Sequence, residues 1–132
     1  MPKTVLLDTN FLMIPAQFRV DIFSELERIC NFDYRIAVLD RAVYELESIK
    51  KNQKGKNKLA ASFALKLLKS KGLKIIRTNS KKSVDNLTAE YAEKGAIIAT
   101  QDSALRKIIR EKKGATIFLR NKKFLVMDKN VL

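Results

Sequence analysis

A short apolar run that stops at a carboxylate opens the chain. Val5-Leu6-Leu7 is followed by Asp8 and then by Thr9-Asn10. An apolar run of this length between polar residues is typical of a strand buried in a parallel sheet. In open α/β sheets, ligands bind beyond the carboxyl ends of the strands. Asp8 is therefore predicted to lie at the edge of a sheet where a ligand would bind.

Strand patterns alternate with helical patterns along the rest of the chain. Further strands are predicted at residues 34–39, 73–77, 96–100, 116–119 and 124–127, with the last two forming an antiparallel edge hairpin. Helices are predicted at 19–30, 41–51, 59–70, 84–94 and 103–113, after a short helix that begins at Phe11 and is interrupted by Pro15. Residues 50–58 contain no apolar side chain and are predicted to be a basic loop. The alternation predicts an α/β sandwich with a mainly parallel sheet, in one domain over residues 1–132.

Composition limits the chemistry that this chain can perform. It contains no histidine, which excludes a Ser-His-Asp triad and the usual zinc ligand sets. Any metal ligands would be oxygens, and these favour Mg²⁺ or Mn²⁺. Cys30, the single cysteine, lies at helical spacing from Phe23 and Leu26, so we interpret it as a core residue. No apolar run approaches the roughly 20 residues that span a bilayer, and the start shows no signal-peptide pattern, so a cytoplasmic protein is expected.

The charge of the chain is strongly positive and unevenly distributed. The 27 basic residues outnumber the 14 acidic ones, and all but six of the basic residues lie after residue 50. Such a surface attracts polyanions, chiefly nucleic acid. A lysine-rich thermophilic surface is the alternative, but that alternative predicts similar numbers of glutamate and lysine. The charge pattern therefore favours nucleic acid as the partner.

Several acidic residues stand where strands give way to helices. Asp8, Asp40 and Asp102 each follow a predicted strand and precede a helix, so each could simply be an N-cap, an interpretation that is strongest for Asp40. Asp85 lies in the first turn of a predicted helix, where acids commonly complement the helix dipole. In a parallel sheet, the helix and strand between Asp85 and Asp102 can return both to the same edge.

Glu45 differs from these because it lies inside a helix. It flanks the apolar face formed by Ala42, Leu46 and Ile49, either as an edge residue whose head reaches water or as a ligand. Four carboxylates would then lie together at one edge of the sheet: those of Asp8, Glu45, Asp85 and Asp102. They would repel one another unless a divalent cation binds. Such a site in a basic protein suits metal-assisted phosphodiester hydrolysis.

The sequence resembles the PIN-domain nucleases. The resemblance is carried by Leu7-Asp8-Thr9-Asn10-Phe11-Leu12, by Glu45 within a helix, by Asp85 and by Ala99-Thr100-Gln101-Asp102. It implies a parallel five-stranded sheet of order 3-2-1-4-5 between two helical layers, and an Mg²⁺- or Mn²⁺-dependent endoribonuclease. It also implies that Asp8, Glu45, Asp85 and Asp102 are the catalytic metal ligands, supported by Asn10 in a second shell to which we also assign Asp40.

Two branches of this family compete. The opening Asp-Thr-Asn-Phe-Leu and the basicity resemble archaeal relatives of small-subunit rRNA-processing PIN nucleases, whereas the short chain equally suits a VapC-type toxin, which would need an antitoxin. Many such toxins have Ser or Thr at the position of Asp40. A homodimer stays open, as does an RNA-binding PIN scaffold without cleavage. A phosphatase of the haloacid dehalogenase type would need a second Asp where Asn10 stands.

Basic residues close to the acids are the expected RNA contacts. Arg106 and Arg110 are four residues apart, so they share one face of the predicted helix. Lys107 is next to Arg106 in the sequence. The predicted RNA-binding residues are Lys51, Lys54, Lys56, Lys58, Arg106, Lys107 and Arg110. Contacts with phosphates would depend weakly on RNA sequence.

Overall fold

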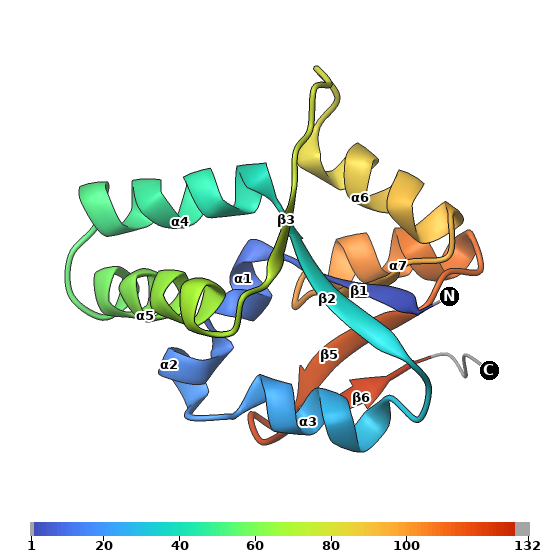
Figure 1. Ribbon diagram of the computed structural model, residues 1–132, viewed down its shortest axis with the longest axis horizontal. Helices are drawn as coiled ribbons and strands as arrows, with labels where there is room; N and C mark the ends of the chain where they lie inside the picture. The colour runs from blue at the N-terminus through green and yellow to red at the C-terminus, as the bar shows by residue number, and fades with distance from the viewer. Residues whose placement is uncertain (1, 129–132) are drawn as a thin grey trace.

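A computed structural model describes residues 2–128 and contains a six-stranded sheet flanked by helices (Figure 1). The strands are β1 (Lys3–Leu7), β2 (Tyr34–Leu39), β3 (Lys74–Ile76), β4 (Ile97–Ala99), β5 (Thr116–Arg120) and β6 (Phe124–Met127). The helices are α1 (Thr9–Leu12), α2 (Ile14–Phe18), α3 (Ile22–Ile29), α4 (Asp40–Asn52), α5 (Lys56–Ser70), α6 (Val84–Glu93) and α7 (Ser103–Glu111).

The strand order confirms the predicted topology. The strands lie in the order β3-β2-β1-β4-β5-β6, and all neighbouring pairs are parallel except β5 and β6. The order in which strands are added to the sheet changes direction at β1, which has β2 on one side and β4 on the other. This is the switch point where an open α/β sheet leaves room for a ligand beyond its carboxyl edge.

Alternation of side chains along the strands divides the core into two layers. Val5 and Leu7 face the larger cluster, formed with helices α1, α2, α3 and α5, while Leu6 faces a second cluster formed with α6 and α7. Ile98 shares the face of Leu6, as the period of two requires. The sheet is therefore covered on both sides, which confirms the three-layer arrangement and explains why its central strands are apolar throughout.

The helices after β1 differ from the prediction in where they begin. Pro15 does not interrupt a helix; it occupies the first turn of α2, where its missing N–H is tolerated. The helix predicted from residue 19 begins only at Ile22, because Asp21 is its N-cap and accepts hydrogen bonds from the backbone N–H groups of Phe23 and Ser24. Arg19 ends α2 in the left-handed conformation.

The predicted basic loop at residues 50–58 is wrong. Helix α4 continues to Asn52 and α5 begins at Lys56, so the two form a helical hairpin with a three-residue link. Gly55 has a φ of 67°, a left-handed conformation that glycine adopts without strain. Figure 1 shows α4 and α5 side by side, extending away from the sheet toward the link.

The single cysteine is confirmed as a core residue. Cys30 follows α3 and belongs to the larger cluster, and burial raises the pKa of its thiol to about 11. Within residues 2–128, no helix has the length and apolar character needed to cross a membrane.

Candidate active site

Asp8 lies where β1 ends beside β4. Leu7 pairs with Ala99, and the Asp8 N–H continues the ladder by donating to the Ala99 carbonyl at 2.9 Å. The carboxylate of Asp8 accepts one hydrogen bond from the Thr9 N–H at 2.9 Å and another from the Thr100 hydroxyl at 2.8 Å. Asp8 is thus the N-cap of α1 and is also fixed by the segment after β4.

Thr100 connects two of the predicted ligands. Its side chain is completely buried, and its hydroxyl donates to Oδ2 of Asp8 while accepting from the Asp102 N–H at 3.1 Å. Oδ1 of Asp102 caps α7 by accepting from the N–H groups of Ala104 and Leu105. Thr100 was not among the predicted site residues, although the motif Ala99-Thr100-Gln101-Asp102 contains it.

Glu45 reaches the same edge from α4. Its Oε2 accepts a hydrogen bond from the buried hydroxyl of Thr9 at 3.0 Å. Thr9 therefore contacts both acids, through its N–H to Asp8 and through its hydroxyl to Glu45. Thr9 is a second residue that the sequence analysis left out of the site.

The electrostatic environment of Asp8 is unfavourable for a bare carboxylate. Burial raises its pKa above the ordinary value, and the charges of Glu45 and Asp85 raise it further. The hydrogen bonds from Thr100 and Thr9 act in the opposite direction but do not cancel the effect of burial. The structure therefore brings Asp8, Glu45 and Asp85 within electrostatic range of one another, and connects Asp102 to Asp8 through Thr100.

Asn10 supports the loop between β4 and α7. Its side-chain oxygen accepts from the Gln101 N–H at 3.1 Å, and the side-chain oxygen of Gln101 accepts from the Leu119 N–H at 2.7 Å. These bonds extend from α1 across β4 to β5. The second-shell role of Asn10 stays a prediction, and this geometry is consistent with it.

Asp40 is not the helix cap that its position suggests. It is already within α4, the N-cap position is Leu39, and no side chain caps this end. Both Asp40 oxygens instead accept from Thr78, from its N–H at 3.0 Å and its hydroxyl at 2.7 Å. These bonds lower the pKa of Asp40, so it stays ionised and holds the loop after β3 against α4. Its assignment to a second shell stays a prediction.

The donor set suits a hard divalent cation in its chemistry. Among residues 2–128, none of the four predicted ligands forms an ion pair with a lysine or arginine, although the protein carries a net charge of +13. As the described side chains lie, however, no three acidic or cysteine residues form a group that could hold a metal ion. Mg²⁺ usually keeps several waters and is bound through one or two carboxylates, so the chemistry of these residues, rather than a preformed ligand cluster, is what fits the cation.

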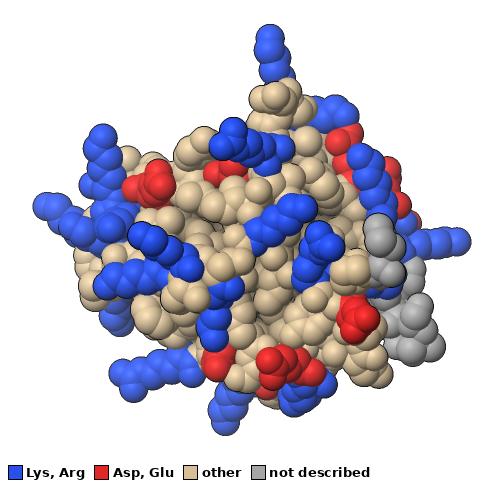
Figure 2. Space-filling model, in the orientation of Figure 1, with Lys and Arg blue, Asp and Glu red and all other residues tan. Residues whose placement is uncertain are grey.

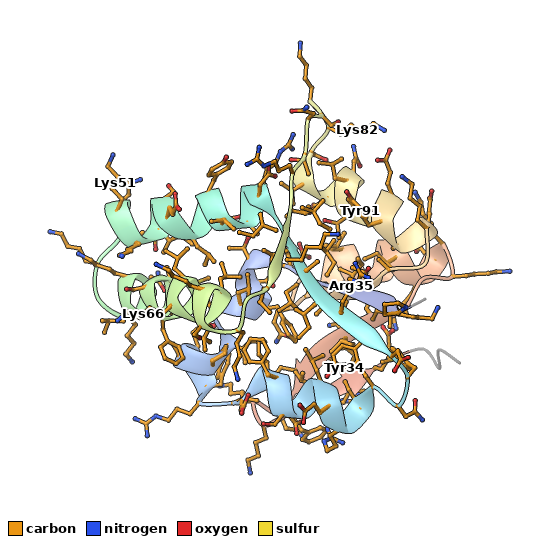
Figure 3. All side chains as sticks on the ribbon, viewed as in Figure 1. Tyr34, Arg35, Lys51, Lys66, Lys82 and Tyr91 are labelled. Atoms are coloured by element: carbon orange, nitrogen blue, oxygen red, sulfur yellow. The ribbon has the colours of Figure 1, made fainter. Side chains whose placement is uncertain are left out.

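The predicted RNA-binding residues fall into two separate groups. Lys51, Lys54, Lys56 and Lys58, which we call the basic tip, lie at the link between α4 and α5. Figure 2 shows basic side chains gathered at this end of the molecule, and Figure 3 shows Lys51 at the outer end of α4. With a rise of about 1.5 Å per residue, Lys51 lies roughly 9 Å farther along α4 than Glu45. The basic tip is therefore near the acids but not beside them.

The basic residues of α7 are partly engaged elsewhere. The Arg106 guanidinium stacks on Phe118 of β5, 4.1 Å from the ring centroid, and its buried Nε has no hydrogen-bond partner. Arg110 Nε lies 3.8 Å from Asp128, whose carboxylate also binds Thr116. Lys107 is exposed. RNA contacts by these three residues stay a prediction, and the ion pair of Arg110 gives that residue a structural role as well.

A parallel α/β sheet with acids at its switch point defines the class of this protein. The chain belongs to the PIN-like domain family, whose model matches residues 5–122. This membership confirms the family indicated by the motifs around Asp8 and Asp102.

Curated relatives cover most of the chain. It is 31% identical over 121 residues to Ribonuclease VapC4 of Methanocaldococcus jannaschii, covering 89% of this chain and 90% of that protein. It is 32% identical over 111 residues to Ribonuclease VapC9 of Archaeoglobus fulgidus, covering 83% of this chain and 78% of that protein.

Solved structures share the fold at lower sequence identity. The PIN domain endonuclease Utp24 superposes with a TM-score of 0.78 at 22% identity, over 98% of this chain and 94% of that one. A domain of a functionally unknown protein from Methanocaldococcus jannaschii gives a TM-score of 0.56 at 16% identity, over 98% of this chain and 96% of that one.

Proposed function

We propose that this protein is an endoribonuclease that requires Mg²⁺ or Mn²⁺ and hydrolyses RNA phosphodiester bonds. The observation that carries the proposal is Asp8, whose carboxylate is partly buried beside Glu45 and Asp85 and lacks a cationic partner among the described residues. A bound divalent cation would offset the unfavourable charge. The two curated relatives are named as ribonucleases, which supports RNA as the substrate.

The ligands would be Asp8, Glu45, Asp85 and Asp102. When bound, the cation supplies a nucleophilic water at neutral pH and offsets charge on the phosphate. The chain supplies orientation: Thr100 and Thr9 fix the Asp8 carboxylate, and Thr9 also holds Glu45. The two backbone N–H groups of α7 fix Asp102.

Asp8→Asn tests the catalytic part of the proposal. Replacing the carboxylate with an amide weakens cation binding with little change in shape, so cleavage of labelled single-stranded RNA should be lost. The assay compares Mn²⁺, Mg²⁺ and a chelator. Unchanged cleavage by the variant would refute the metal site, and absence of cleavage by the wild type under every condition would favour a non-catalytic RNA-binding scaffold.

Asp40→Asn and Glu45→Gln test the assignment of ligands. Glu45 contacts Thr9 at the site, whereas Asp40 is occupied by Thr78. Glu45→Gln should therefore lose most activity while Asp40→Asn keeps most of it. The opposite result would reverse the two assignments.

We propose rRNA processing as the biological role, on the resemblance of the opening Asp-Thr-Asn-Phe-Leu stretch. A VapC-type toxin is the second candidate, and the identity to VapC4 and VapC9 favours it. The two roles differ in their partner. A small protein encoded beside this gene that binds the chain and inhibits its cleavage would establish the toxin role and exclude the first.

A further inference from the structure

A hollow lined in part by Asp40 and Thr78 lies between the start of α4 and the segment after β3. It has a volume of about 570 Å³, within the range of small-ligand pockets. Tyr44 of α4 lines one side, and Ile75, Arg77 and Asn79 line the other, from the end of β3 and the loop that follows. Tyr44 directly precedes Glu45, so α4 presents the hollow and the acidic edge from adjoining positions.

The walls of this hollow are held in place by the first turn of α4. Asp40 binds the backbone and side chain of Thr78. Arg41 donates to the carbonyls of Ser80 and Lys82 in the same loop. Figure 3 shows Lys82 on this loop, above the start of α4. The loop is therefore fixed before any ligand binds, which reduces the entropy lost on binding.

Two large side chains that line the hollow are exposed to solvent. Tyr44 is 64% exposed and Ile75 is 48% exposed. An exposed aromatic ring beside a cationic side chain is the arrangement that binds a base by stacking and its phosphate by charge. Asp40, which also lines the hollow, disfavours a phosphate inside, whereas an uncharged base is not repelled. Arg77 is exposed and lines the hollow, where it could meet the phosphate.

The direction of α4 connects the hollow with the basic tip. Tyr44 and Lys51 are seven residues apart, which is about two helical turns and places them on the same face. A strand with a base at Tyr44 would have its backbone in reach of Lys51.

We propose that this hollow binds one nucleobase of single-stranded RNA, stacked on Tyr44 and contacting Ile75, with its phosphate on Arg77. The inference rests on the proposed function, because RNA is the substrate proposed there and Tyr44 directly precedes the proposed ligand Glu45 on α4. The contact is stacking, so it tolerates different bases.

The test measures binding of a labelled short oligoadenylate in Ca²⁺, which is expected to fill the metal site while supporting little cleavage. Tyr44→Ala should weaken binding about 5- to 160-fold, the range of one lost base–aromatic stack, and Tyr44→Phe should keep the wild-type affinity. Phe63→Ala is the matched control, since Phe63 is an exposed aromatic residue on α5, outside this hollow. An oligoadenylate with abasic nucleotides should bind the wild type and Tyr44→Ala equally weakly.

The outcomes separate the two proposals. A wild type that cleaves and binds RNA, with Tyr44→Ala unchanged in affinity and KM, would overturn only the base site and leave the hollow for a protein partner. A comparable loss in Phe63→Ala would also overturn it, because general apolar contact would then explain the effect. A wild type that neither binds nor cleaves RNA would overturn both. Support requires weaker RNA binding by Tyr44→Ala in Ca²⁺, whether or not the wild type cleaves, and, where it cleaves, a raised KM with a nearly unchanged kcat.

Discussion

Thr100→Val removes the hydroxyl that joins Asp8 to Asp102 while keeping the shape of a completely buried side chain. A hydrogen bond to a charged acceptor contributes about 1.5–3 kcal/mol and a neutral one about 0.5–1.5 kcal/mol. The two losses together should lower the free energy of unfolding by about 2–4.5 kcal/mol. For a domain of this size, 1 kcal/mol corresponds to roughly 3–6 °C in Tm. Thermal unfolding followed by circular dichroism measures the change.

The same variant should also impair the site, because Asp8 loses one of the two bonds that orient it. Loss of such a supporting bond typically costs 10- to 100-fold in metal affinity or activity. Thr116→Val is the matched control. Thr116 is equally buried and also binds a carboxylate, that of Asp128, but it lies at the amino end of its strand, β5, rather than beyond a carboxyl end. It should lose stability but retain cleavage at a temperature where both variants are folded. Equal activity in the two variants would refute the positioning role of Thr100.

Three further results are expected. Burial raises the pKa of Asp8, so between its ordinary and its raised pKa the metal-free folded state binds more protons than the unfolded state, and stability falls as pH rises through this window. Asp8→Asn should lack this fall. Curves of stability against pH that stay parallel for wild type and variant would contradict the prediction. Neutralising the basic tip should weaken RNA binding for all sequences and reduce the slope of log affinity against log salt by about 0.7 per lost contact; an unchanged slope would place the RNA path elsewhere. Cys30, with a pKa of about 11 and a buried side chain, should react with a thiol reagent at neutral pH only after unfolding; rapid reaction of the folded protein would show that this part of the core opens.

The sheet could be predicted because its signal is local. Each central strand is an apolar run that ends at a polar residue, and the helices between strands require parallel connections. The acids proposed for the site were chosen for the same reason: Asp8 directly follows β1, and Asp102 lies three residues after the end of β4. Their structural role as N-caps was also among the alternatives, and the structure shows it for both.

Predictions failed where a residue's hydrogen-bond partner is distant in the sequence, or where a helix is so exposed that it shows no apolar periodicity. Asp40 looked like the best cap, but its partner Thr78 is 38 residues away, which no local pattern reveals. The ends of α4 and α5 are solvent-exposed and need no apolar residues, so residues 50–58 looked like a loop. Side-chain bonds at helical spacing, such as Asn52 to Ser48 and Asn57 to Gln53, accompany these turns instead.

Helix α4 carries, in sequence order, the residues on which each proposal depends. Its first turn fixes the loop after β3 through Asp40, its second presents Tyr44 to the hollow and Glu45 to Thr9, and its last leads into the basic tip. Its 13 residues span about 20 Å. A flexible polyanion that follows this helix would meet stacking, cleaving and charge-neutralising groups within that length. Residues 51–59 are all exposed and add nothing to the core, so under the proposed function the outer end of this hairpin would serve RNA binding.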